Sequence, residues 1–409
     1  MKKVFSILII ALLSMYGRTQ DTLKRVTIDS NVIQNDKKDT KKKWYESFAI
    51  RGYTQFRYNR FLETNSNLNC EQCDKSIGNN NSFFLRRMRI IFFGNVHERV
   101  YIYIQPDFAS SASSTGLHFG QLRDAYFDVS LDKSKEFRIR FGQSKIPYGF
   151  ENMQSSQNRL ALDRNDALNS AVSNERDMGA FFYWAPKKTR KLFSDLVNDG
   201  LKGSGDYGVF ALGVYNGQTA NRPEMNNNVH LVTRLSYPFQ LKNQIVELGV
   251  QGYSGKYVVT SKTKGVISKD KDEYLDERFA GSITWYPKPI GFQAEYNIGT
   301  GPQYNPLTNT IEQKKLNGGY AQIMGNINWK SMTILPFVKY QHYNGGKKHE
   351  LDARSYNVKD LEIGIEWQPN KNFELVTIYT ISDRTYEDGA LKNNHQKGNL
   401  LRLQFQANF

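Results

Sequence analysis

Long apolar runs are scarce in this 409-residue sequence. The clearest one, VFSILIIALLSMY, follows the basic start MKK and is shorter than the roughly 20 apolar residues that a membrane-spanning helix needs. No second such run follows, and the mean hydropathy is -0.60. A basic start with a short apolar segment is typical of a secretory signal peptide. We therefore predict a signal peptide at residues 1–20 and export of the mature chain.

Cysteine and histidine are scarce as well. The two cysteines, Cys70 and Cys73, form a lone C-x-x-C in the polar stretch LNCEQCDKS. A thioredoxin-like motif needs a βαβ context and a zinc site needs two more ligands nearby, and both are missing. The spacing therefore favours a local disulfide between Cys70 and Cys73. The 6 histidines fall in expected turns, loops and strand ends without a nucleophile-elbow or zinc-protease motif. The sequence predicts neither an enzyme nor a metal or cofactor site.

Proline is also rare, with 11 residues, whereas aromatic residues reach 13%, nearly all of them Tyr and Phe. This composition favours β-structure, and it suits the aromatic girdles of a membrane β-barrel. The net charge of +15 falls to +12 when the three basic residues of the signal peptide are removed. A basic exported chain points to anionic solutes or an anionic membrane surface, and nucleic acid is the poorest of the candidate partners.

Apolar and polar side chains alternate along much of the remaining sequence. In FAIRGYTQFRYN (48–59), Phe, Ile and Tyr fall on one face while Arg, Gln and Asn fall on the other. The last segment, LLRLQFQANF, alternates in the same way and ends in Phe409. About sixteen such strands are expected. They lie near 48–59, 83–94, 99–107, 122–130, 136–142, 178–185, 207–215, 229–237, 244–254, 278–286, 291–299, 318–329, 332–342, 357–367, 373–381 and 397–409.

The connections between these strands alternate between short turns and long polar loops. An even number of alternating strands with this loop pattern is the signature of an outer-membrane barrel. We predict an all-β fold: a transmembrane antiparallel β-barrel at residues 47–409, with short periplasmic turns and long extracellular loops. Residues 21–46, which include NDKKDTKKK, are predicted to be a periplasmic tail. The connection 186–206 is long where a short turn is expected, and its apolar spacing predicts a short helix that could contact a periplasmic partner.

The segment SFFLRRMRIIFFG (82–94) carries three arginines in an apolar strand. An arginine that faces lipid at the bilayer centre costs about 2–4 kcal/mol, whereas one that faces a wet lumen costs little. Alternation therefore turns Arg87 and Arg89 inward and leaves Arg86 near the outer rim, where it can reach the headgroups. The same reasoning gives an arginine-lined lumen, an anion-binding stripe on neighbouring strands. Its predicted members are Arg51, Arg57, Arg87, Arg89, Arg99, Arg138 and Arg140.

Few acids face this stripe, namely Asp107, Asp124 and Asp128. Later strands bring inward acids, so the alternative is a zoned lumen without anion selectivity. These later acids are Glu247, Glu295, Glu362 and Glu366.

The loop 143–177 is long enough to fold into the lumen and narrow it. In that arrangement its cations would meet permeating anions: Lys145, Arg159, Arg164 and Arg176. The alternative is an external lid that its own acids stabilise: Glu151, Asp163, Asp166, Glu175 and Asp177.

The motifs FFLRRMRIIFFG, LRDAYFDV, RFGQSKIPYGFE and ERDMGAFF resemble those of the phosphate-selective porin O and P family. The resemblance is densest over residues 48–185. It implies a sixteen-stranded outer-membrane barrel, usually a homotrimer, that conducts phosphate, polyphosphate or other small anions past basic residues. The positions that match the family motifs are Arg87, Arg89, Arg138, Arg140, Lys145 and Arg176.

The sequence thus predicts a porin of the bacterial outer membrane, surrounded by lipid, through which small anions diffuse passively. Two alternatives remain open at this point. One is a structural or partner-binding barrel, and the other is a general porin without anion selectivity.

Overall fold

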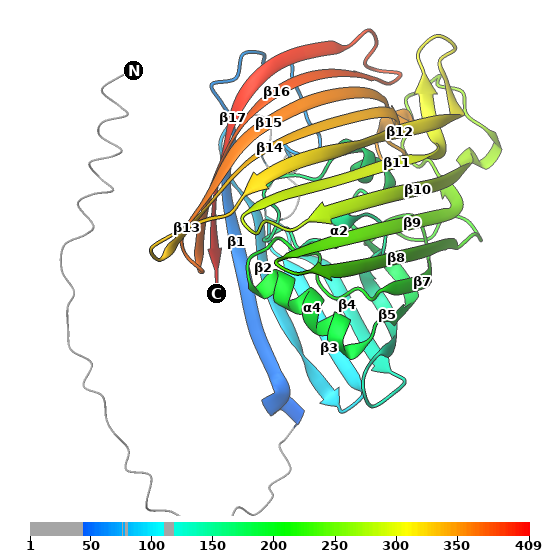
Figure 1. Ribbon diagram of the computed structural model, residues 1–409. Coiled ribbons are helices and arrows are strands. Elements are labelled where there is room, and N and C mark those ends of the chain that lie inside the picture. The colour runs from blue at the N-terminus through cyan, green and yellow to red at the C-terminus, as the bar shows by residue number, and fades with distance from the viewer. Residues whose placement is uncertain (1–43, 76, 78–80, 110–117) are drawn as a thin grey trace, which may run out of the picture. The chain divides into compact units, whose positions relative to one another are not determined.

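The protein is described from a computed structural model that covers residues 44–75, 77, 81–109 and 118–409. The predicted signal peptide and nearly all of the predicted tail lie outside these residues. Within them, seventeen strands form one antiparallel sheet that closes on itself, because β1 pairs with both β2 and β17 (Figure 1). The short β13 and the longer β12 both pair with β14, so the wall has sixteen strand positions, as predicted.

The elements have the following bounds. The strands are β1 (Phe48–Phe61), β2 (Phe83–His97), β3 (Val100–Asp107), β4 (Gln121–Ser130), β5 (Phe137–Lys145), β6 (Arg176–Trp184), β7 (Phe210–Tyr215), β8 (His230–Leu241), β9 (Gln244–Val258), β10 (Glu273–Trp285), β11 (Ile290–Asn305), β12 (Thr310–Gly325), β13 (Ile327–Trp329), β14 (Met332–Gly346), β15 (Ser355–Asn370), β16 (Phe373–Glu387) and β17 (His395–Asn408). The helices are α2 (Phe150–Met153), α3 (Asp166–Ala171) and α4 (Lys187–Asn198), with short 3-10 turns η1 (Trp44–Ser47), η2 (Asp270–Asp272) and η3 (Leu351–Ala353).

Alternation along the strands sorts side chains between the two faces of the wall. In β8, buried His230, Val232 and Arg234 alternate with exposed residues such as Leu231 and Leu235. The exposed face is apolar and the buried face is largely polar, the reverse of a soluble protein and the arrangement expected of a barrel in lipid. No helix among the described residues is long and apolar enough to cross a membrane.

All the expected strand segments are present, and several extend further at the long-loop end. The predicted loop 300–317 is mostly strand, because β11 continues to Asn305 and β12 begins at Thr310. Above the bilayer both faces of a strand are wet. The side chains there no longer alternate between apolar and polar, so the sequence pattern fades before the hydrogen-bonded ladder ends.

Two β-bulges change which side chains face the lumen. Gln55 lies opposite Arg87 and Phe56 lies opposite Leu85, which leaves Arg86 as the extra residue of β2. A bulge of this kind lets two consecutive side chains point to one side. Arg86 is buried and faces inward, so the prediction that it lies at the outer rim is wrong. In β4 a second register shift, opposite Gln105 and Pro106, leaves Arg123 as the extra residue, and it is buried as well.

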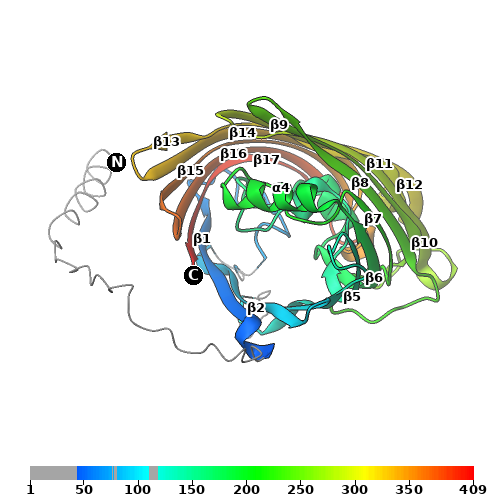
Figure 2. The ribbon, with the colours of Figure 1, turned by 60° about the horizontal axis from the view of Figure 1, so that its bottom comes forward.

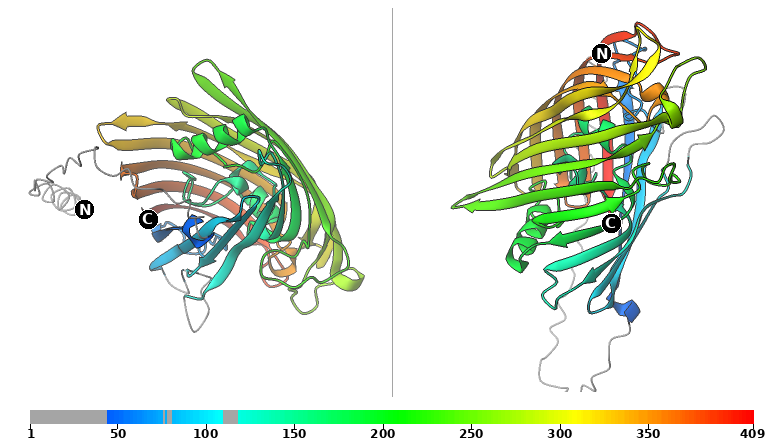
Figure 3. Two further views of the ribbon diagram at one scale, coloured as in Figure 1. Left: turned by 90° about the horizontal axis from the view of Figure 1, so that it is seen from below. Right: turned by 90° about the vertical axis from the view of Figure 1, so that its right-hand side faces the viewer.

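Residues 146–175, here called the lumen loop, fold inside the ring of strands (Figure 2; Figure 3, left). The loop carries α2 and α3, and the Asn165 side chain caps α3 by accepting from Leu168 N. It reaches several parts of the wall: Tyr148 Oη donates to Asn297 at 2.6 Å, and Glu151 pairs with Lys339 at 2.5 Å. The arrangement is therefore the inward one of the two alternatives for loop 143–177, not an external lid.

The connection 186–206, here called the α4 connection, contains the expected helix and also lies within the ring, at the short-turn end (Figure 2). Leu196 and Leu201 pack against Phe150 of the lumen loop and against Ile245 and Tyr286. These contacts turn the helix toward the interior of the barrel.

Candidate functional site

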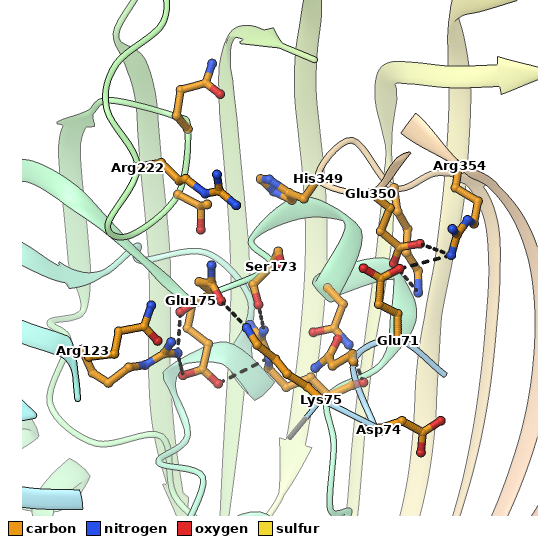
Figure 4. A pocket seen from close by; sticks show the side chains of 18 of the residues that line it. Glu71, Asp74, Lys75, Arg123, Ser173, Glu175, Arg222, His349, Glu350 and Arg354 are labelled. Carbon is orange, nitrogen blue, oxygen red and sulfur yellow. Dashed lines mark hydrogen bonds and ion pairs between the residues drawn. The ribbon is translucent and has the colours of Figure 1, made fainter. Parts of the chain in front are cut away.

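A cavity of about 1000 Å³ opens at the long-loop end of the barrel (Figure 4). Wall strands β2 and β4, the lumen loop and the loops before β2, after β7 and after β14 supply its lining. Nine cationic side chains face five carboxylates around it. The cations are Lys75, Arg86, Arg87, Arg89, Arg123, Arg164, Arg222, Lys347 and Arg354, and the carboxylates are Glu71, Asp74, Asp107, Glu175 and Glu350. This cavity, here called the vestibule, is therefore net positive.

Several of the predicted lumen arginines are neutralised by carboxylates on adjacent strands. Arg89 Nε pairs with Asp107 at 2.8 Å. Arg140 holds Asp128 through two bonds of 2.7 and 2.9 Å. Such fork-like pairs are strong and satisfy most of the donors of a guanidinium group. The inward acids of the first strands are thus the partners of the predicted arginines.

Arg176 of β6 reaches past β5, since it pairs with Asp124 of β4 at 2.9 Å and also with the preceding Glu175. These ion pairs connect nearby strands of the wall: β2 with β3, β4 with β5, and β4 with β6. They leave little unpaired charge for a solute.

Other arginines of the wall are paired by inserted segments. Asp163 of the lumen loop meets Arg57 at 2.8 Å, Arg86 at 3.4 Å and Arg402. Although burial opposes it, the positive charge of Arg57, Arg402 and Arg86 holds the pKa of Asp163 well below its usual range. In the same way Asp206 of the α4 connection pairs with Arg138 at 2.9 Å. Asp163 and Asp206 therefore fix the lumen loop and the α4 connection to arginines of the wall.

Two wall arginines, Arg87 and Arg123, here called the vestibule floor, lack a close carboxylate partner. Arg87 Nη1 donates to Gln55 Oε1 at 2.7 Å, and its Nε has no hydrogen-bond partner among the described residues. Arg123 Nη2 donates to the backbone carbonyl of Asn174 at 2.9 Å and lies 3.9 Å from the Glu175 carboxylate. Their guanidinium charge is the least compensated of the wall arginines that line the vestibule.

Lys75 projects toward this floor from the loop before β2 (Figure 4). Its ammonium lies 3.4 Å from Asn174 Oδ1. Burial lowers the pKa of Lys75 to about 8, and the nearby Arg123 and Arg86 act in the same direction. Part of the shift therefore comes from repulsion between Lys75 and these arginines, as expected where positive charges are concentrated.

The opposite side of the vestibule carries a buried carboxylate among cations. Glu350 accepts a hydrogen bond from Tyr356 Oη at 2.5 Å and lies 3.4 Å from Arg354 and 3.7 Å from Lys347. Burial raises the pKa of Glu350 to about 7 despite the opposing pull of Lys347. Arg354 also reaches Glu71 at 3.1 Å, which ties the loop before β2 to the loop after β14.

The remaining predicted residues take other places. Arg99 lies in the turn between β2 and β3, partly exposed and 3.9 Å from Glu98, so its placement in the lumen is wrong. Strand β3 begins at Val100, one residue later than the predicted segment 99–107. Arg51 is exposed at the short-turn end of β1, with its guanidinium carbon 5.4 Å from the centre of the Phe93 ring.

Lys145 is buried, and its ammonium donates to three successive backbone carbonyls, at Asn152, Met153 and Gln154. It therefore anchors the lumen loop rather than facing a solute. Cys70 and Cys73 are joined by a disulfide in the loop before β2. Within the described parts of the chain, no group of three or more His, Cys, Asp or Glu side chains could hold a metal ion.

Sequence reasoning missed six of the lining cations: Arg86, Arg123, Lys75, Arg222, Lys347 and Arg354. For the first two a signal exists. Adjacent charged residues inside an apolar strand, as in Arg86–Arg87 and Arg123–Asp124, cannot both face water in a regular strand, so they indicate a bulge. Lys75 and Arg222 lie in loops, where periodicity carries no information.

The solved structures that resemble this barrel are outer-membrane channels. The outer membrane channel DcaP of Acinetobacter baumannii is 14% identical, with a TM-score of 0.52 over 88% of this chain and 97% of that one. Salmonella typhi OmpF is 12% identical, with a TM-score of 0.53 over 88% and 97%. The anion-selective porin from Comamonas acidovorans is 8% identical, with a TM-score of 0.51 over 89% and 99%. At these identities the likeness shows the fold alone.

No curated protein matches the chain. The family model of phosphate-selective porin O and P, however, matches residues 65–409. That match covers most of the chain, including all but the first of the wall strands. The protein therefore belongs to the phosphate-selective porin O and P family and is a porin of the bacterial outer membrane.

Proposed function

We propose that this porin conducts small anions by passive diffusion and that the vestibule sets the preference for anions. The observation that carries this proposal is the uncompensated charge on the floor. Arg87 has no carboxylate within ion-pair distance among the described residues, and the nearest to Arg123 lies 3.9 Å away. With nine cations against five carboxylates in the lining, the vestibule attracts anions from the extracellular side.

The mechanism is electrostatic. The positive potential raises the local concentration of anions, and N–H donors of Arg87 and Arg123 replace part of the hydration shell. A guanidinium group presents a fork of donors that matches two oxygens of a phosphate, which favours phosphate-like solutes over halide. Several neighbouring cations, including Lys75 and Arg222, offer the ion successive weak sites, so that it can leave again.

The lumen loop narrows the path below the vestibule, since Asp163, Glu151 and Tyr148 tie it to the strands β1, β14 and β11. Arg89, Arg140 and Arg176 are close to their carboxylates and act mainly as braces of the wall. Phosphate as the main solute and assembly as a homotrimer both stay predictions from the family resemblance.

One observation favours the alternative of a general porin without anion selectivity. Most wall arginines are paired at hydrogen-bond distance, as with Arg140 and Asp128. If such pairs cancel the field throughout the lumen, the charge of Arg87 and Arg123 would have no effect on permeation.

Reconstitution in planar bilayers under a salt gradient tests the two functions. We expect a reversal potential that favours anions in the wild type and a shift toward zero in the double variant Arg87→Gln/Arg123→Gln. Arg99→Gln is the control, because it makes the same Arg→Gln change once, in a periplasmic turn, and should leave the reversal potential unchanged. A wild-type channel that favours cations, or equal reversal potentials in both variants, would reject the proposal.

A further inference from the structure

The α4 connection occupies a place where this barrel otherwise has short turns. At the same end, Leu241 and Gln244 are joined by two residues, as are Asn370 and Phe373. Between Trp184 and Phe210 the chain instead makes a twelve-residue helix and a further loop. This segment lies inside the ring of strands rather than projecting from it (Figure 2).

One side of α4 is fixed by apolar contacts. Phe193 is buried against Ala185 and Val209, which flank the segment. Leu196 and Leu201 belong to a cluster with Phe150 of the lumen loop and Tyr286 of the wall. The helix is thus packed against the underside of the lumen loop, and the two inserted segments share one apolar core.

Ion pairs anchor the end of the α4 connection to two separate strands of the wall. Asp206 pairs with Arg138 of β5 at 2.9 Å and with Arg190 of α4 at 2.7 Å. Four residues earlier, the Lys202 ammonium pairs with Glu366 of β15 at 2.6 Å. Strands β5 and β15 are not neighbours in the sheet, so the segment reaches across the lumen.

The Lys202–Glu366 ion pair is buried, and the lumen loop also contacts Lys202. The side chains of Lys202 and Glu366 are 5% and 0% exposed, and Gln154 of the lumen loop donates to the Lys202 carbonyl at 2.6 Å. By contrast Lys191 and Asp195 form a 2.6 Å pair on the exposed side of α4. Buried pairs hold a fixed geometry, whereas exposed ones contribute little to stability.

We propose that the α4 connection is a second constriction of the channel, in series with the lumen loop and on its periplasmic side. The Lys202–Glu366 pair is the tether that keeps it across the lumen. A solute that passes the lumen loop must then pass this segment, so the tether controls the size of the exit. The proposal rests on the protein being a channel, but not on its preference for anions.

Single-channel recording separates the two properties. The double variant Lys202→Met/Glu366→Gln removes the tether without leaving one buried charge alone. We expect a larger unit conductance with more fluctuation of the open level, and an unchanged reversal potential. The control Lys191→Met/Asp195→Asn makes the same changes on the exposed side of the same helix and should conduct as the wild type does. Equal conductance of both variants and the wild type would overturn the proposal.

A second variant tests the tether even if the first variant misfolds. In Lys202→Cys/Glu366→Cys the native cysteines are held in their own disulfide, so a short bifunctional maleimide joins only the new pair. Within one preparation, joining them should lower the unit conductance from the enlarged value back toward that of the wild type. A conductance that does not respond to the crosslink would count against the tether. A wild-type reversal potential that does not favour anions would reject the proposed anion preference, while the conductance comparison would still decide whether the tether exists.

Discussion

Arg86 and Arg87 are neighbours in β2, yet both side chains face the lumen. The bulge opposite Gln55 and Phe56 places them there, and Arg89 follows on the same side after one outward residue, Met88. The strand thereby carries three arginines in an apolar segment without exposing one to lipid, where each would cost about 2–4 kcal/mol at the bilayer centre. Arg123 reaches the vestibule through the second bulge, in β4. Two of the nine vestibule cations, Arg86 and Arg123, are therefore placed by irregularities of the wall.

The bulge in β2 predicts which deletions the strand tolerates. Deleting Arg86 should restore regular alternation between Leu85 and Arg87 and give a folded barrel with one vestibule cation fewer. Deleting Met88, which lies in a regular part of the strand, should reverse the faces of the residues beyond it and prevent assembly. Heat-modifiable migration in gel electrophoresis reports folding of both proteins. Assembly of the Met88 deletion and failure of the Arg86 deletion would contradict the assigned bulge.

The anion preference should fall as the pH rises from about 6 to about 9. The raised pKa of Glu350, about 7, means that this group is neutral below that pH and negative above it. The lowered pKa of Lys75, about 8, means that its positive charge is lost above that pH. Both changes make the vestibule less positive. Reversal potentials recorded across this range should show the decline, and Lys75→Met/Glu350→Gln should flatten it. A preference that rises with pH would refute the assignment.

Asp163 should be needed to hold the lumen loop in place. The variant Asp163→Asn leaves Arg57, Arg86 and Arg402 without this carboxylate, and breaking a buried ion pair costs about 3–5 kcal/mol where water does not replace it. We expect a lower urea midpoint and a larger, noisier conductance.

Asp383→Asn is the matched control for this variant. Asp383 pairs with Lys397 at 2.9 Å but is 39% exposed, so its loss should change the midpoint little. If the two variants have the same midpoint, the lumen loop is held by other contacts.

Arg140 and Arg87 should differ in how their loss can be rescued. Arg140→Gln leaves Asp128 with only the more distant Arg138, 4.0 Å away, and makes the lumen less positive, so the anion preference should fall. Adding Asp128→Asn removes the pair as a whole and should bring the reversal potential back to the wild-type value. For Arg87→Gln there is no carboxylate to remove, and Gln55→Ala should not restore the preference. Rescue of both, or of neither, would contradict the division into bracing and solute-facing arginines.

The fold was predictable because it follows from a local rule. In a barrel, each strand residue faces either hydrocarbon or solution. The alternation of apolar and polar residues in β1, β5 and β17 is therefore visible in the sequence. The site was predictable only in part. The alternation of faces correctly placed Arg87 in the lumen. It failed for Arg86 and Arg123, because each is the extra residue of a bulge that interrupts the alternation. Arg99 was misplaced because a strand boundary at a turn shifts by one residue without changing the apolar pattern.

The local order of residues specifies the wall: its strands, its inward and outward faces and its net positive charge. Which charges stay available depends on the folded arrangement, because pairing joins residues that are distant in sequence. Asp163 and Asp206 neutralise wall arginines from inserted segments, while Arg87 and Arg123 lie beyond the reach of a close carboxylate. A charge is compensated over a few ångströms of space, and the order of residues along the chain does not record that distance.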